Sequence, residues 1–550
     1  MLAPQSKRND EIAAGIIGEY GRMSGGRGNW ETHWQEIAER IVPSHKNMFT
    51  NRGMGTKGEK RTEYIFDSTA ALALNRFASI LDSLLTPRNQ TWHRLMASDS
   101  YLNKNRDVRL WFEEVNRLLF KYRYAPRANF ASQNQQNYKA LGAYGTGCMY
   151  IDRLVNQDVG LRYRNIHLSE VYFEENHQGM VDKALRYFPL TARQAAQKWG
   201  EDKLPDGIGN ALKINPEREF FFIHCVKPNM EQEYGVGDYR GMPYASYYVS
   251  IDGNRLMEEG GYTTMPYAVS RYEQADGEVY GRSPGMDVLP AVKTLNEQKK
   301  TVLKQGHRTV DPVLLVHDDG IIDTFSLKPG ALNAGGVNSD GRAMVQALPV
   351  GSIAIGKELM DDERAVINDA FLVSLFQILM ESPQMTATEV LERSREKGIL
   401  LAPTIGRQQS EYLGPMIERE LDLLSQLRLL PPMPPLLVEA QGDYRVEYDS
   451  PLSRAQRAEE ASGLMRTVET ALQIVNVTQN PEPLDHFNWD VIIPEVSDIQ
   501  GVPARWMRAQ EEVMAMRQGR AQQAQEQTAI QAAPGAAALV NATTKAQKGA

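Results

Sequence analysis

Two helical segments that flank a short strand-rich insertion constrain the fold of this chain more than any other feature. A Gly-Pro turn at Gly281–Gly285 introduces the first helix, from about residue 286 to 307, and Pro312 ends it. The second helix, from about 357 to 380, is strongly apolar at helical spacing. Residues 313–350 between them open with a Val-Leu-Leu-Val run and are rich in glycine. The pattern predicts two helices joined by a compact β-rich insertion.

Each of these helices is expected to bury one apolar face. On the first helix that face consists of Val288, Val292, Leu295 and Val302. On the second it consists of Leu359, Val366, Ala370, Val373, Phe376 and Met380. Intervals of three and four residues place the members of each set on one side of a helix.

The first half of the chain changes from a helical to a strand-like pattern near residue 149. Helices are predicted at about 30–42, 69–85 and 107–122. The clearest apolar stripe, in the second of them, consists of Leu72, Phe77, Ile80, Leu81 and Leu84. From 149 to about 269, short runs rich in β-branched and aromatic residues predict strands. The clearest runs are 149–151, 219–226 and 244–251.

The C-terminal part reads as broken helices followed by a low-complexity tail. Ser382-Pro383 interrupts the second long helix, and helical character then continues to about Leu430 with breaks near Pro403 and Pro415. A proline-rich linker at 431–435 leads to a strand at 444–448 and a helix that starts at Ser450-Pro451. The buried face expected for that helix is Ala461, Leu464, Val468, Leu472 and Val475. A last helix is expected from about residue 503, and the Ala- and Gln-rich tail is expected to be disordered, or helical only within an assembly.

Composition narrows the class of protein. A chain of 550 residues with 42% hydrophobic and 24% charged residues is large enough for several folded domains. It contains no run of eighteen apolar residues, which argues against a membrane span, and its start lacks the apolar segment of a secretory signal. Only two cysteines are present, so a reducing, cytosolic compartment is expected. A net charge of -8 argues against a protein whose main task is to bind nucleic acid tightly.

Each candidate motif for catalysis, metal binding or cofactor binding lacks a group that its chemistry requires. Gly281–Gly285 matches the G-x-S-x-G nucleophile elbow, with Ser283 as nucleophile, but Pro284 has no N–H to contribute to an oxyanion hole. A turn that leads into a helix is the better interpretation, and a serine hydrolase is kept as an alternative. The histidines are too scattered for a metal site, and Gly53–Lys60 lacks the Gly-Lys step of a phosphate loop. We therefore expect no enzyme activity, no metal and no cofactor.

A polar face on the first long helix is the more informative feature. Lys293, Glu297, Lys300 and Lys304 are spaced four, three and four residues apart. Such spacing places them on one side of the helix. In an isolated chain this is best explained as a solvated face. In a ring of identical subunits the same residues would recur around an axis and line a hole.

Four segments carry a resemblance to the head-to-tail connectors, or portal proteins, of short-tailed bacteriophages. They are Gly281–Asp287 (GRSPGMD), Val310–Val316 (VDPVLLV), Met385–Val390 (MTATEV) and Glu411–Arg419 (EYLGPMIER). The resemblance also includes the order of predicted parts over about residues 8–520. It implies a mixed α+β, mostly helical fold with a wing, a two-helix stem, a small β-containing clip and a helical crown.

The resemblance places each part of this architecture. The boundaries it implies are wing 1–280, first stem helix 281–309, clip 310–352, second stem helix 353–380, tunnel loop and wing helices 381–440, crown 441–515 and a C-terminal extension 516–550. The narrowest part of the channel would lie at Glu381, Ser382, Pro383, Gln384, Met385 and Thr386. The stem residues Lys293, Glu297, Lys300 and Lys304 would line the channel.

The resemblance also implies function and partners. Portal proteins form a ring of twelve subunits at one capsid vertex, through which double-stranded DNA is packaged and later ejected. The implied partners are other copies of the chain, terminase, the major capsid and scaffolding proteins, tail adaptor proteins and DNA held without sequence preference, with no membrane. The protein would be assembled in the host cytoplasm and reside in the virion. Another virion structural subunit, from the tail or capsid, stays open as an alternative.

Overall fold

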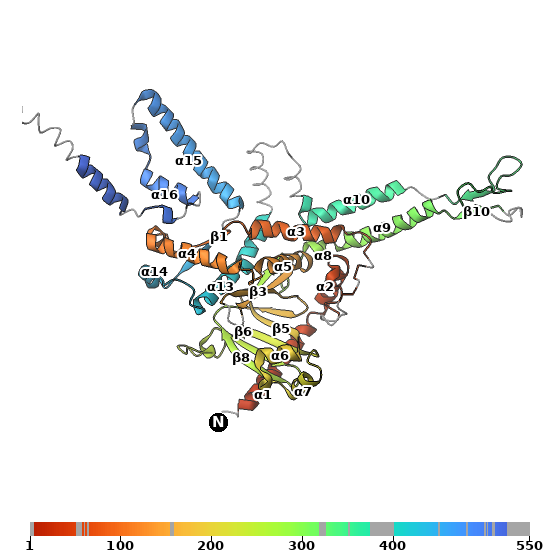
Figure 1. The fold of residues 1–550 in the computed structure, drawn as a ribbon, viewed down its shortest axis with the longest axis horizontal. Helices are drawn as coiled ribbons and strands as arrows, with labels where there is room; N and C mark the ends of the chain where they lie inside the picture. The colour runs from red at the N-terminus through yellow and green to blue at the C-terminus, as the bar shows by residue number, and fades with distance from the viewer. Residues whose placement is uncertain are drawn as a thin grey trace, which may run out of the picture. The chain divides into compact units, whose positions relative to one another are not determined.

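The computed structural model of the chain consists of two compact units, each described separately below (Figure 1). It describes residues 5–50, 58, 59, 61, 62, 65–154, 159–317, 326–349, 353–374, 401–448, 451–479, 482–499, 502, 504–508 and 512–524. The first unit comprises residues 1–90 and 121–429, and the second comprises 91–120 and 430–550. About half of the described residues are helical and the rest include two larger antiparallel sheets, so the mixed α and β class is confirmed.

A five-stranded antiparallel sheet in the first unit lies between helices on both of its faces. Its strands, in spatial order, are β4 (Val171–Glu175), β5 (Val181–Thr191), β6 (Glu219–Pro228), β7 (Tyr244–Ser250) and β8 (Arg255–Tyr262). Alternate side chains of β6 point to opposite faces. Ile223 and Cys225 pack beneath α1 (Gln5–Gly25), whereas Phe220 and Phe222 pack with α6 (Ala192–Trp199) and α7 (Asp206–Ile214).

A smaller sheet in the same unit supports the helices that lead to the candidate site. Its order is β3 (Leu161–Asn165), β2 (Thr146–Arg153) and β9 (Tyr267–Arg271), all antiparallel. Helix α5 (Phe130–Tyr144) runs directly into β2 and packs against α3 (Thr69–Leu85). The remaining N-terminal helix, α2 (Gly28–Arg40), buries Trp34 and Ile37.

Two long helices and a hairpin complete the first unit. Helix α9 (Leu289–Val310) follows the short α8 (Pro284–Asp287), and α10 (Ile353–Ala370) packs alongside it (Figure 1). Between them lies an antiparallel pair, β10 (Leu314–Val316) and β11 (Val345–Ala347). The predicted order of helix, β insertion and helix is confirmed. A helix at 401–407, a π-helical segment (Gln408–Leu413) and α13 (Gly414–Gln426) end the unit.

The second unit is built around a strand pair that joins distant parts of the chain. β1 (His93–Ala97) pairs with β12 (Tyr444–Tyr448), and α4 (Arg106–Arg123) contributes most of its length. The Trp111 indole donates a hydrogen bond to the Pro431 carbonyl at 3.1 Å. The C-terminal helices of this unit are α14 (Pro435–Glu439), α15 (Pro451–Thr478), α16 (Trp489–Ile499) and a helix at 512–524.

Several predicted elements are confirmed and others are corrected. Helix 69–85 and strand 444–448 have the predicted boundaries. The purely strand-like interpretation of 149–269 is wrong, because α6 and α7 lie within it, and the largely helical interpretation of the N-terminal part missed β1. The described part of the last helix covers residues 512–524, and a short 3₁₀ turn (Ala504–Trp506) lies where this helix was expected to begin.

Three of the predicted apolar faces are also corrected. On α3 the predicted Phe77 and Leu81 are buried, but Leu72 is 54% exposed, and the unpredicted Ala73 and Leu74 are buried beside them. On α10, the predicted Leu359 and Val366 are about half exposed, and the helix buries Met360 and Ile367 instead. The predicted Val373 is buried just beyond the end of α10, and Phe376 and Met380 lie outside the described residues. On α15, Leu472 is 44% exposed and only Ala471 is buried among the residues of that helix whose side chains are described. About half of the surface of each of these apolar side chains is left uncovered within the described part of a single chain.

Candidate functional site: the α9–α10 helix pair and its hairpin

The start of α9 is fixed by close backbone contact between the Gly281–Gly285 turn and the end of α5. Gly145 adopts a left-handed conformation, with φ of 76°, and a Cβ there would overlap the carbonyl of Gly281. A Cβ on Gly285 would lie 2.9 Å from the Ala143 carbonyl oxygen. Glycine is required at these positions because no side chain fits between the two backbones. The turn therefore sets where the helix pair begins.

Ser283 caps the short helix α8, which leads into α9, and is not an exposed nucleophile. It is 1% exposed, its Oγ donates to the Ala143 carbonyl at 2.8 Å, and the Met286 N–H donates to the same Oγ at 3.0 Å. Pro284 occupies the beginning of the helix, as predicted. Both hydrogen-bonding functions of the hydroxyl are thus used within the fold, and the geometry is that of an N-cap.

Helices α9 and α10 are held together and anchored on the segment before α3. A Cβ on Gly356 would lie 2.7 Å from a Val302 methyl carbon, so the helices approach closely at this level. The Asn296 side-chain carbonyl accepts the backbone N–H groups of Phe66 and Asp67, each at 3.1 Å. Arg364 on α10 pairs with Asp67 at 2.6 Å. One short segment therefore positions both helices.

The predicted channel-lining residues share one side of α9 but differ in their partners. Lys293 Nζ lies 2.5 Å from a Glu36 carboxylate oxygen on α2, a contact that lowers the pKa of Glu36. Lys300 lies 3.4 Å from Glu297 and near the Phe66 ring. Lys304 is exposed, and no ion pair to it occurs among the described residues. The sequence offered no sign of the Glu36 contact, since 257 residues separate the two partners.

The hairpin at the far end of the pair is small and exposes much apolar surface. Only three residues of each strand pair, from Leu314 with Ala347 to Val316 with Val345. The apolar side chains around it that are at least 40% exposed are Val313, Leu315, Val316, Leu327, Leu332, Val337 and Leu348. An isolated two-stranded hairpin is marginally stable in water. By itself, the hairpin therefore leaves most of its apolar surface exposed to solvent.

A hollow lies where α9 meets the hairpin. Its volume is about 370 Å³, and it is lined by Thr301, Lys304, Gln305, Arg308, Val313, Leu348 and Pro349. The helix contributes its polar and basic side chains, and the segments next to the two strands contribute the apolar ones. The predicted constriction, Glu381, Ser382, Pro383, Gln384, Met385 and Thr386, lies outside the described residues.

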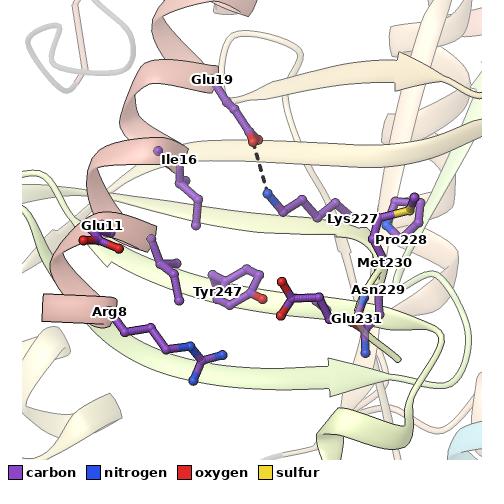
Figure 2. Close-up of a pocket in the computed structure, with 13 residues that line it drawn as sticks. Arg8, Glu11, Ile16, Glu19, Lys227, Pro228, Asn229, Met230, Glu231 and Tyr247 are labelled. Atoms are coloured by element: carbon purple, nitrogen blue, oxygen red, sulfur yellow. Dashed lines mark hydrogen bonds and ion pairs between the residues drawn. The ribbon is translucent and has the colours of Figure 1, made fainter. Parts of the chain in front are cut away.

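A second hollow lies between α1 and the five-stranded sheet, away from the helix pair in the fold of the same unit. Figure 2 shows Arg8, Glu11, Ile16 and Glu19 on α1 facing Tyr247 and the end of β6. Its volume is about 510 Å³. Burial favours a higher pKa for Glu19, but Lys227 at 3.1 Å and Lys183 at 3.2 Å outweigh burial and lower it. These ion pairs hold α1 against the sheet.

The described residues contain no group of three or more His, Cys, Asp or Glu side chains arranged to hold a metal ion. Cys148 and Cys225 are buried, and burial raises the pKa of Cys225 to about 12. Neither thiol is therefore an activated nucleophile. In the part of the chain that is described, no helix has the length and apolar character needed to cross a membrane.

Comparison with known proteins identifies the family. A family model described as bacteriophage head to tail connecting protein matches residues 13–507. The chain belongs to this family. A probable portal protein of Bordetella phage BPP-1 is 28% identical over 544 residues, which cover 97% of this chain and 96% of that protein. A portal protein of Salmonella phage epsilon15 is 27% identical over 538 residues, covering 96% and 94%.

The expected family and function are thereby confirmed. The function of the chain is that of a head-to-tail connecting, or portal, protein, and portal proteins are structural rather than enzymatic components of the virion. The four segments that carried the resemblance fall in different structural contexts. Gly281–Asp287 forms the turn on α5, Val310–Val316 leads from α9 into the hairpin, and Met385–Val390 lies outside the described residues.

The remaining connector segment, Glu411–Arg419, forms the buried support of the small sheet. It spans the π-helical turn and the start of α13. Glu411 accepts two hydrogen bonds from Arg271 on β9, at 2.8 and 3.1 Å, and Arg419 donates to the Ile151 carbonyl on β2 at 3.3 Å. Next to it, Glu420 pairs with Arg123 out of contact with solvent. These pairs could not be predicted from the sequence, because each joins residues more than a hundred positions apart.

Proposed function

We propose that copies of this chain form a ring-shaped channel at one capsid vertex and that double-stranded DNA passes through it during packaging and ejection. The observation that carries the proposal is the connector family match across residues 13–507. The α9–α10 pair with its exposed hairpin supports it, because that module offers apolar surface that a neighbouring copy can bury. A ring of twelve copies is the number that the family resemblance implies.

The proposed parts of each subunit follow the boundaries expected from the family. They are wing 1–280 and 381–440, stem 281–309 and 353–380, clip 310–352, crown 441–515 and extension 516–550. In this scheme α9 and α10 are the stem and β10 and β11 belong to the clip. Because β1 pairs with β12, residues 91–120 belong structurally with the unit that contains the crown.

Ring closure requires each subunit to present two different surfaces, one to each neighbour. The hairpin suits this requirement because, among the described residues, β10 and β11 pair only with each other, so their outer edges can pair with a strand from another copy. Burial of its exposed apolar side chains at about 25 cal/mol per Å² would then contribute to assembly.

The channel is proposed to contact DNA weakly and without reading bases. Each neutralised phosphate adds salt-dependent affinity, so a chain with a net charge of -8 does not hold the duplex tightly. Lys293 is already paired with Glu36, which reduces the positive charge available to DNA. The proposed narrowest part, Glu381–Thr386, is mostly polar and offers few fixed charges.

The proposed partners are terminase, the major capsid and scaffolding proteins and tail adaptor proteins. The proposed location is the portal vertex of the virion, after assembly in the host cytoplasm. We propose no catalytic activity and no cofactor, because the serine of the G-x-S-x-G match is a buried helix cap.

Replacing residues 313–348 with a short Gly-Ser linker tests the contribution of the hairpin. We expect native mass spectrometry to show rings for the full chain and mainly monomers for the shortened one. A matched control replaces the exposed loop 230–240 between β6 and β7 with a linker of the same kind, and it should still form rings. Binding of the full-length ring to the cognate terminase separates a portal from another virion subunit. Rings that do not bind terminase would contradict the proposal.

A further inference from the structure

We propose that neighbouring subunits meet along the helix pair, with Lys300 and Lys304 of one copy facing Glu358 and Asp362 of the next. This inference rests on the ring proposed above and specifies which surfaces form its subunit interfaces. It also replaces the channel-lining role expected for Lys300 and Lys304.

The two lysines point away from α10. Val302 is the residue of α9 that lies against α10, at Gly356. A residue two positions away in an α-helix is turned by about 200°, so it lies on the opposite side. Lys300 and Lys304 are each two positions from Val302, one before it and one after it. They therefore form a basic edge of the helix pair on the far side of α9, and this edge also carries Glu297, which lies 3.4 Å from Lys300.

The two carboxylates point away from α9 by the same reasoning. Glu358 follows the contact residue Gly356 by two positions, and Asp362 follows the buried Met360 by two positions. Both carboxylates are exposed, and no ion pair to either occurs among the described residues. They form an acidic edge of the pair on the far side of α10. The helix pair thus has opposite charges on opposite edges.

The heights of these residues along the pair match. The helices run in opposite directions and touch at Val302 and Gly356. Lys300 lies two residues before Val302, and Glu358 lies two residues after Gly356. Because the helices are antiparallel, both residues lie on the same side of the contact and at the same level along the pair. Lys304 and Asp362 lie about 6 Å from that level in opposite directions, at 1.5 Å per residue. Rotation about an axis that runs along the helix pair keeps every residue at its height. In such a ring Lys300 of one copy meets Glu358 of the next. Lys304 is then within reach of Glu358, and Asp362 is within reach of Lys300.

A second copy of this chain is the partner that the charges select. A closed ring joins two different surfaces of the same subunit, and the basic and acidic edges are two such surfaces with complementary charge. DNA would be attracted by the basic edge but repelled by the acidic one. A neighbouring copy satisfies both edges at once.

Charge reversal in the full-length chain tests the inference. The variants are K300E/K304E, E358K/D362K and the combination of all four changes, and the control is K203E/K213E at two exposed lysines away from the helix pair. Each reversal pair alone should raise the protein concentration at which half the chains are in rings by about tenfold or more, because repulsion replaces attraction at every interface. The combination should return this concentration to within about threefold of the unaltered chain. Circular dichroism of the monomers checks that each variant folds.

The outcomes separate this inference from the proposed ring. Rings that form equally well in both reversal variants would overturn the inference and leave the ring intact. The same result accompanied by altered passage of DNA would return the lysines to the channel wall. An unaltered chain that stays monomeric would contradict the ring itself, and the inference with it.

Discussion

Arg123 and Glu420 form an ion pair in which both side chains are fully buried. The Arg123 Nε lies 2.9 and 3.2 Å from the two carboxylate oxygens, its Nη2 also contacts the carboxylate, and the Tyr163 hydroxyl donates to Glu420 at 2.5 Å. Burial favours a lower pKa for Arg123, but Glu420 outweighs burial and raises it. The pair joins the end of α4 to α13 next to the small sheet.

Replacing Glu420 with Gln should destabilise the first unit by about 3–5 kcal/mol, because it leaves the Arg123 charge buried without a counter-ion. Urea unfolding followed by tryptophan fluorescence measures this loss. The matched control is Glu114→Gln, which removes the exposed partner of Arg117 and should leave the unfolding midpoint unchanged. Equal midpoints for both variants would show that the buried pair is not needed for stability.

Replacing Gly145 or Gly281 with Ala should destabilise the chain by about 3 kcal/mol or more, since a Cβ at either position overlaps backbone atoms of the other segment. The control is Gly209→Ala on α7, where a Cβ meets nothing within 4 Å. That change should be neutral or stabilising by up to about 1 kcal/mol. Thermal unfolding of the three variants provides the comparison. A small effect at Gly145 would argue against the close contact that fixes the start of α9.

Replacing Ser283 with Ala should lower stability by about 1–2 kcal/mol, because the helix loses its side-chain cap and the Met286 N–H keeps only the Ser283 backbone carbonyl as acceptor. Labelling with a fluorophosphonate probe separates a cap from a nucleophile. We expect no labelling of the unaltered chain, because the hydroxyl is buried. Labelling that disappears in Ser283→Ala would support the hydrolase alternative.

The His45 environment predicts that stability falls on acidification. His45 lies 3.1 Å from the Tyr144 hydroxyl, and its ring centre is 4.7 Å from that of His167. Burial, with Arg61 and Lys139 nearby, lowers the pKa of His45 to about 4, and burial, His45 and Arg27 lower that of His167. An unfolded histidine has a pKa near 6.5, so between about pH 6.5 and 4 the unfolded chain binds more protons. The free energy of unfolding therefore decreases as pH falls through this window.

Melting temperatures between pH 7.5 and 4.5 measure this dependence. His45→Phe removes one of the groups that the unfolded chain protonates, so its melting temperature should fall less steeply over the same range. His177→Phe, at an exposed position, should behave as the unaltered chain does. An identical pH dependence in His45→Phe and the unaltered chain would contradict the assignment.

Helices and strands with a clear local pattern of apolar residues were predicted correctly from the sequence. Helix 69–85 and strand 444–448 have a regular spacing of apolar residues and clear residues at their ends. Both lie at the predicted boundaries. The resemblance to the connector family could also be seen in the sequence. Two of the segments that carry it, GRSPGMD and EYLGPMIER, make specific contacts in the structure: the first packs its backbone on the end of α5, and the second pairs with Arg271. Strand β1 was missed although its residues alternate between buried and half-buried, because its partner β12 lies about 350 residues further along the chain.

Burial was the property that sequence alone predicted least well. Leu359 and Val366 on α10 and Leu472 on α15 have the spacing of a buried face but are exposed within the described part of one chain. Periodicity indicates which residues share a side, but not which side meets the rest of the molecule. The candidate site has the same limit, since the contact of Lys293 with Glu36 depends on how α2 packs in three dimensions.

Electron microscopy of the purified full-length chain, viewed down the axis of the assembled particle, tests the central claim most directly. We expect a closed ring of identical subunits around an open hole wide enough for a DNA duplex. A chain that remains monomeric at high concentration, or that assembles without a central opening, would contradict the account.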